Sequence, residues 1–180
     1  MKNFFSVLAV CFVTNVTAAE TVLTCKIGPG PFQRLRVVRD SKIASTHVYY
    51  LQQGKVRTPF FGSRDNSRGS SVHAQCVGKK RRALIVSGEF TANALQGFAI
   101  ANSPDSDRLE RLDFAEKSRP MRVYLAAHEM VIVVATNGLG ETNGKYVAYR
   151  HIAGGGEQGD VQGINELPTL PVFDVFNLNH

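Results

Sequence analysis

The stretch Met121–Thr136, MRVYLAAHEMVIVVAT, decides the fold class that the sequence predicts. From residue 121 to residue 125, apolar and polar side chains alternate, which is typical of a strand with one buried face. Residues 126–129 can make a turn, and residues 130–134 are apolar throughout, as in a strand that is buried on both faces. We therefore predict a β-hairpin here and place it at the centre of the protein.

Shorter patterns of the same kind recur on both sides of this hairpin. They predict strands at residues 21–27, 32–39, 47–52, 55–60, 71–77, 83–90, 95–102 and 144–152. Residues 108–117 fit either a helical turn or a strand, and we favour a strand because the neighbours are strands. The prediction is an all-β, single-domain antiparallel β-sandwich or soluble β-barrel of about nine or ten short strands.

The first 19 residues predict a secretory signal peptide. Lys2 supplies a positive charge, Phe4–Val13 is a short apolar run, and Thr17–Ala19 supplies small residues before a cleavage site after Ala19. An uncleaved anchor is the alternative, but the apolar run is short for a membrane span. We expect a periplasmic or secreted protein with a β domain at 20–153 and no membrane span after cleavage.

Residues 154–180 are expected to form a glycine-rich linker and an irregular C-terminal tail. Gly154, Gly155 and Gly156 break the strand pattern, and the residues after them show no clear periodicity. Apolar residues gather between 170 and 176, so the tail is expected either to pack on the domain or to dock a partner.

Two cysteines, Cys25 and Cys76, remain after removal of the signal peptide. Each is in step with the apolar residues of its predicted strand. In an oxidising compartment such a pair predicts one disulfide, which would stabilise the fold by about 4 kcal/mol. Two buried free thiols are the alternative.

The charge is unevenly distributed along the chain. Residues 20–82 contain 13 Lys and Arg against 3 Asp and Glu, a net charge of +10, whereas residues 83–180 contain 7 against 12, a net charge of −5. This asymmetry indicates either a surface that faces a polyanion or charge complementarity between the two halves.

Cations on predicted strands and loops of the first half are the candidates for binding an anion. If their strands are adjacent, the outward cations form one patch that attracts nucleic acid, lipopolysaccharide phosphates or an acidic protein. Tyr49 and Tyr50 are candidates for aromatic contacts within it. The alternative is that these charges are only solvated and keep edge strands from pairing. The candidates are Arg34, Arg36, Arg39, Lys55, Arg57, Arg64, Arg68, Lys79, Lys80, Arg81 and Arg82.

The sequence predicts no catalytic residue, metal site or cofactor. His73 and Cys76 lie three apart on a predicted strand and so point to opposite faces. His128 and Glu129, at the tip of the central hairpin, could form an acid–base pair, but hairpin tips are commonly polar for solubility alone.

The favoured function is that of an exported, non-enzymatic binding protein with an anionic macromolecule, an envelope component or an acidic protein as its partner. One alternative is an inhibitor or immunity-type protein that blocks an enzyme with a loop such as 62–71, interpreted as a flexible polar loop. Another is an enzyme whose active site is dispersed along the sequence. The oligomeric state is not predicted.

Overall fold

The computed structural model describes residues 19–30, 33–79, 81–106, 108–139, 142–154, 159–169 and 174–178. The predicted signal peptide up to residue 18 and the apolar tail segment 170–173 lie outside these ranges. The described residues form thirteen strands: β1 (Glu20–Lys26), β2 (Arg34–Arg39), β3 (His47–Gln53), β4 (Val56–Pro59), β5 (Arg68–Val77), β6 (Ala83–Glu89), β7 (Leu95–Asn102), β8 (Leu109–Glu116), β9 (Pro120–Leu125), β10 (Glu129–Ala135), β11 (Tyr146–Ile152), β12 (Asp160–Ile164) and β13 (Asp174–Asn177).

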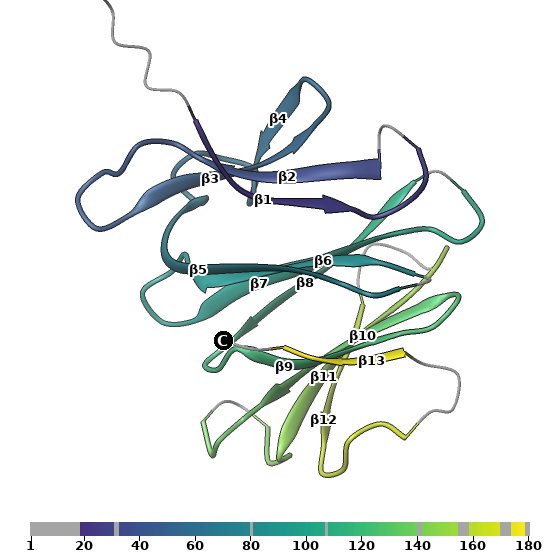
Figure 1. Cartoon of the computed structure of the whole chain (residues 1–180). Coiled ribbons are helices and arrows are strands. Elements are labelled where there is room, and N and C mark those ends of the chain that lie inside the picture. Colours follow the sequence, from purple (N-terminus) through teal and green to yellow (C-terminus); the bar gives the residue numbers. More distant parts are fainter. Residues whose placement is uncertain are drawn as a thin grey trace, which may run out of the picture.

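The strands form two antiparallel sheets, which confirms the all-β prediction and favours the sandwich over the closed barrel. The larger sheet has the order β1-β2-β3-β5-β6-β7-β8, with β4 paired to β3, and the smaller has the order β12-β11-β10-β9-β13. Strands β3 and β5 pair through only two residue pairs, His47 with Gly69 and Val48 with Arg68. The larger sheet folds over at this point, so Figure 1 shows three layers: β1–β4, β5–β8 and β9–β13.

The middle layer is buried on both faces at the β6–β7 hairpin. In β6, Leu84 and Val86 belong to the core shared with the first layer, whereas Ala83 and Ile85 belong to the core shared with the third layer. Strand β7 alternates in the same way between the two cores. The β6–β7 hairpin is therefore the centre of the protein.

The predicted hairpin at residues 121–136 is confirmed as β9 and β10, but it lies in an outer layer. Strand β10 is nevertheless largely buried on both faces. Its outward residues Val131 and Val133 form a cluster with Tyr124 and Ala148, on which Leu167 of the tail packs. The continuous apolar run is therefore explained by the packing of tail residues on the outer side of β10, and it does not indicate that the strand lies at the centre of the protein.

The C-terminal tail is more regular than the sequence indicates. Strand β12 pairs with β11 at one edge of the smaller sheet, and β13 pairs with β9 at the other edge. Both strands are short and largely exposed, so they lack the apolar alternation by which the other strands are predicted. The described part of the tail belongs to the smaller sheet.

Aromatic residues fill one end of the core between the first and middle layers. The ring centroids of Phe60 and Phe98 are 5.0 Å apart and those of Phe61 and Phe90 are 4.9 Å apart, both in edge-to-face arrangements. Tyr49 stacks on Phe60 with 5.8 Å between centroids. Such contacts favour one fixed packing of the two layers.

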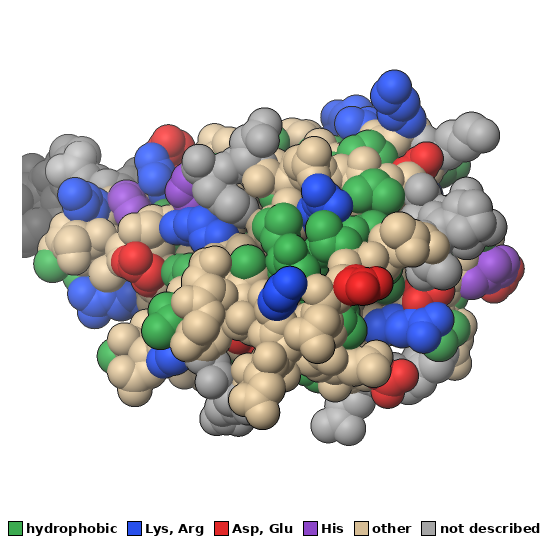
Figure 2. All heavy atoms as spheres, turned by 90° about the horizontal axis from the view of Figure 1, so that it is seen from below, with side chains coloured by type: hydrophobic (Ala, Val, Ile, Leu, Met, Phe, Trp, Pro, Cys, Tyr) green, Lys and Arg blue, Asp and Glu red, His purple; other side chains and the backbone are tan. Residues whose placement is uncertain are grey.

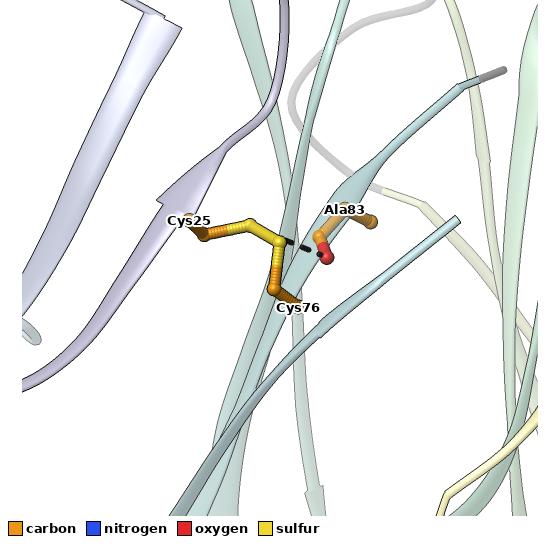
Figure 3. The surroundings of a disulfide bond; sticks show 3 residues. All are labelled: Cys25, Cys76 and Ala83. Atoms are coloured by element: carbon orange, nitrogen blue, oxygen red, sulfur yellow. Dashed lines mark hydrogen bonds between the residues drawn. A yellow bond between two sulfur atoms is a disulfide. The ribbon is translucent and has the colours of Figure 1, made fainter. Parts of the chain in front are cut away.

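The predicted disulfide between Cys25 and Cys76 is present and joins the first layer to the middle layer (Figure 3). Cys25 lies on β1, Cys76 lies on β5, and their Cα atoms are 5.5 Å apart. The Cys25 sulfur also lies 3.9 Å from the carbonyl oxygen of Ala83 on β6. A disulfide sulfur carries no hydrogen, so this approach is a packing contact. The bridge adds a covalent link near the end of β5 opposite to its sparse pairing with β3.

Candidate functional site

A basic face is formed by the outward surface of β1, β2, β3 and β4. Lys26 on β1 pairs with Arg34 on β2, and Arg36 on β2 pairs with Gln52 on β3, which pairs in turn with Arg57 on β4. Residues directly opposite each other on antiparallel strands point to the same side of the sheet. The opposite side of the same strands holds the core residues Cys25, Leu35 and Val37. We call Lys26, Arg34, Arg36 and Arg57 the basic face.

This face is open to solvent and has few acids nearby. Lys26, Arg34 and Arg57 are exposed and Arg36 is half-buried. Residues 20–59 contain only two acids, Glu20 and Asp40. Strands β2 and β4, which carry Arg34, Arg36 and Arg57, thus both pair with β3, and these three cations lie on the same side of the sheet.

Asp40 lies at the edge of the basic face, where three donors surround its carboxylate. Arg57 forms an ion pair with Oδ1, Arg64 Nη2 lies 3.3 Å from Oδ2, and the Tyr50 hydroxyl donates a hydrogen bond of 2.7 Å to Oδ2. The Arg57 guanidinium stacks 3.6 Å from the centroid of the Tyr50 ring. We call Asp40, Tyr50, Arg57 and Arg64 the Asp40 cluster.

The surroundings of Asp40 keep it ionised. Partial burial raises the pKa of this carboxyl, but the hydrogen bonds from Arg57 and Tyr50 and the charges of Arg57 and Arg64 outweigh burial. The net result is a pKa below the ordinary value of an aspartate. Burial and the bond to Asp40 raise the pKa of Tyr50, so the phenol stays a donor.

Several predicted cations have partners away from the basic face. Arg39 forms an ion pair of 2.8 Å with Glu20. Arg68 donates 2.7 Å to the Thr46 hydroxyl. Lys55 is exposed in the turn between β3 and β4, near the basic face but beyond the paired rows.

The two predicted aromatic contacts are already engaged within the protein. Tyr49 is only 4% exposed and packs in the aromatic core, so its ring faces away from solvent. Tyr50 points outward, but Arg57 covers its ring. Stacking on a ligand is therefore not supported by the arrangement of either ring.

The four consecutive cations 79–82 do not act as one patch. Lys79 is exposed, and Lys80 lies outside the described residues. Arg81 is half-buried and donates to the carbonyl oxygens of Ala126 at 2.6 Å and Glu129 at 2.9 Å, at the turn of the β9–β10 hairpin. It also donates 3.2 Å to the Glu110 carboxylate.

Arg82 lies apart from Arg81, at the end of β1. It is half-buried and lines a pocket of about 270 Å³ together with Lys26 and Pro29. Lys26 was not among the predicted candidates, although its position next to Cys25 on an alternating strand places it on the outward side.

Asp40 was missed because its role depends on contacts between segments distant in sequence.

Complementarity between the two halves explains little of the charge asymmetry. Among the described residues, Arg81 with Glu110 is the only ion pair that joins the first half to the second. The other ion pairs there lie within one half, such as Arg39 with Glu20 and Arg111 with Asp113. The positive charge of the first layer is thus left facing solvent.

The opposite face of the molecule has a different character. Figure 2 shows the outer side of the third layer, where hydrophobic side chains gather near the centre and charges of both signs are scattered around them. The apolar residues of this side include the cluster of Tyr124, Val131, Val133 and Ala148, with Leu167 packed on it.

The sequence-adjacent residues His128 and Glu129 do not pair with each other, and a second, buried histidine, His151, lies with Nε2 3.5 Å from the Glu110 carboxylate. His128 Nδ1 lies 3.3 Å from Asp105, whereas Glu129 pairs with Arg150, so the adjacent residues 128 and 129 have separate partners. Within the described ranges, no group of three or more His, Cys, Asp or Glu side chains is placed to hold a metal ion.

An apolar pocket of about 410 Å³ also offers no acid–base pair. Its lining includes Phe61, Asp113 and Tyr149. Asp113 is paired with Arg111, and the Tyr149 hydroxyl lies 2.8 Å from Glu116 and 3.0 Å from the Ala115 carbonyl, to which it can donate. Burial, followed by the contact with Glu116, raises the pKa of Tyr149.

The loop proposed for enzyme inhibition is a closed turn over much of its length. The Ser67 hydroxyl donates 2.6 Å to the Ser63 carbonyl and accepts a hydrogen bond of 2.9 Å from the amide of Phe61. Ser67 is fully buried, and β5 begins at the next residue. The bonds hold residues 61–67 in one compact shape.

Comparison with family models, with curated proteins and with solved structures finds no significant match to this chain. The described residues include no helix with the length and apolarity of a membrane span. The disulfide is compatible with an exported protein.

Proposed function

We propose that this is an exported, non-enzymatic binding protein whose basic face binds an anionic macromolecule. The observation that carries the proposal is the strand register that places Lys26, Arg34, Arg36 and Arg57 on one outward surface. The proposal is also supported by the small number of internal ion pairs: among the described residues, only Arg57 of these four cations is paired with an acid.

The geometry of the face suits an extended polymer. Neighbouring strands lie about 4.8 Å apart, and alternate residues on one strand lie about 7 Å apart. Cations at these spacings meet several charged groups of a polyanion at once and release its counterions, so the affinity falls steeply with added salt.

The test is a double charge reversal, Arg34→Glu with Arg36→Glu. At low ionic strength we expect the affinity for fluorescently labelled heparin to fall about tenfold or more, because two attractive contacts become repulsive. The slope of log affinity against log salt should decrease by about 2, one for each lost contact. Fluorescence anisotropy at NaCl concentrations from about 25 to about 200 mM measures both the affinity and its dependence on salt.

The matched control is Arg108→Glu with Lys145→Glu, which makes the same change in net charge. Arg108 and Lys145 are exposed and lie on the loops before β8 and β11, away from the first layer. Their reversal should change the affinity far less than the reversal of Arg34 and Arg36. Equal losses for the two variants, no binding at low salt, or salt-insensitive capture of a stoichiometric protein partner would each refute the proposal.

A further inference from the structure

The Asp40 cluster has the donors of an anion site, with a carboxylate of the protein in the centre. Its donors come from three segments: Tyr50 from β3, Arg57 from β4, and Arg64 from the turn between β4 and β5. The backbone of Asp40 is held as well, because its amide donates 3.0 Å to the Val48 carbonyl. Its own carbonyl lies 2.9 Å from His47 Nδ1.

One carboxylate does not satisfy these donors. Two guanidinium groups and a phenol face a single negative charge, so the cluster retains a charge of +1. The Arg64 side chain is 64% exposed, whereas that of Asp40 is 22% exposed. A guanidinium carries five N–H donors and fits a tetrahedral oxyanion as readily as a carboxylate. The Tyr50 ring already orients the Arg57 side chain, so Arg57 loses little further conformational entropy when an anion binds.

We infer that Tyr50, Arg57 and Arg64 form a subsite for one phosphate or sulfate group, and that Asp40 occupies it until such a group displaces the carboxylate. The inference rests on the proposed function, since the group is taken to belong to the polyanion on the basic face. Arg57 belongs to both the basic face and the cluster, so a polymer bound along the face passes the subsite.

The internal carboxylate makes the site selective. A carboxylate of a ligand brings the same chemistry as the Asp40 carboxylate that it must displace, so the exchange gains little. A sulfate or phosphate group brings a third oxygen or a higher charge to the same donors. Sulfated and phosphorylated polymers should therefore bind better than polyuronates of equal charge density.

The test is Asp40→Asn, which keeps an acceptor for Tyr50 but removes the competing charge. We expect dextran sulfate and polyphosphate to bind about threefold to tenfold more tightly to this variant than to the wild type, the range expected for one exposed charge pair. Asp65→Asn is the matched control, because it makes the same charge change at an exposed position in the neighbouring turn. Comparing the two polymers tells whether sulfate or phosphate is preferred.

A second variant tests whether the tighter polymer binding of Asp40→Asn depends on Arg64. Adding Arg64→Gln to Asp40→Asn should remove the tighter binding, and Arg64→Gln alone should reduce the preference for dextran sulfate over polygalacturonate. Arg64 is exposed, so this single substitution tests the subsite even if Asp40→Asn does not fold. Equal gains for Asp40→Asn and Asp65→Asn, or a gain that survives loss of Arg64, would overturn the inference.

Tripolyphosphate alone separates this inference from the proposed function. If wild-type protein ignores every polymer but Asp40→Asn binds tripolyphosphate with NMR shifts at the Nε groups of Arg57 and Arg64, the subsite stands and the proposed function fails. If polymers bind through Arg34 and Arg36 without any gain in Asp40→Asn, the proposed function stands and the subsite fails.

Discussion

Replacing Arg81 with methionine is expected to lower the free energy of unfolding by about 3 to 5 kcal/mol. The Arg81 side chain is only 11% exposed and donates to the carbonyls of Ala126 and Glu129 and to the carboxylate of Glu110. Burial lowers the pKa of Arg81, and the Glu110 charge opposes that shift. Methionine fills similar space but removes the arginine partner of Glu110, which keeps His151 Nε2 at 3.5 Å, and the side-chain donor to the hairpin turn at Ala126 and Glu129. Urea unfolding followed by circular dichroism measures the loss.

Lys79→Met is the matched control, because it makes the same charge change two residues away. The Lys79 side chain is exposed, so the variant should stay within about 0.5 kcal/mol of the wild type. A double-mutant cycle with Glu110→Leu should give a coupling of about 1 kcal/mol or more, since removing both charges leaves neither unpaired. If Arg81→Met and Lys79→Met have the same free energy of unfolding, the contacts described for Arg81 do not stabilise the protein.

Replacing both Cys25 and Cys76 with alanine is expected to lower the free energy of unfolding by about 4 kcal/mol in the chain-entropy model. The bridge spans a sequence separation of 51 residues and restricts the unfolded chain accordingly. It also holds β1 of the first layer against the C-terminal end of β5 in the middle layer, whereas the pairing of β3 with β5, at the other end of β5, is only two residue pairs wide. Urea titrations of the oxidised wild type and the variant measure the difference.

Reduction of the wild-type protein provides the control for the alanine substitutions. A reduced chain keeps the side-chain volume of both cysteines and should lose a comparable part of its stability. Similar unfolding midpoints for oxidised and reduced protein would show that the bridge contributes little. Polyanion binding by the folded fraction should be retained, because Cys25 points away from the basic face.

Much of the fold can be predicted from local patterns. Alternation identifies most strands, the turn at Gly54 has the positive φ of 58° that glycine favours, and the two cysteines pair as predicted. Only the two edges of the third layer are hard to predict, because β12 and β13 are exposed strands with little apolar signal. The central position of β6–β7 had a signal in sequence, since residues 83–86 and 98–101 are apolar at successive positions.

The site is harder to predict because it depends on register and on distant contacts. The pattern shows that Arg34 and Arg36 point away from the core, but only the strand pairing shows that Arg57 joins them. Nothing in the sequence distinguishes the buried Arg81 from its basic neighbours. Its burial follows from the approach of a turn 45 residues away, at Ala126.

The double-sided burial of β6 and β7 changes what fixes their register. In a strand with one polar face, a slip by one residue exposes apolar groups and is opposed by the hydrophobic effect. Here both faces are apolar, so polarity alone does not oppose a slip. Side-chain volume does: β7 presents Phe98 and Ile100 to the first layer but Ala99 and Ala101 to the third. A slipped strand would force a phenyl ring into the space of a methyl group, so steric fit selects the alignment.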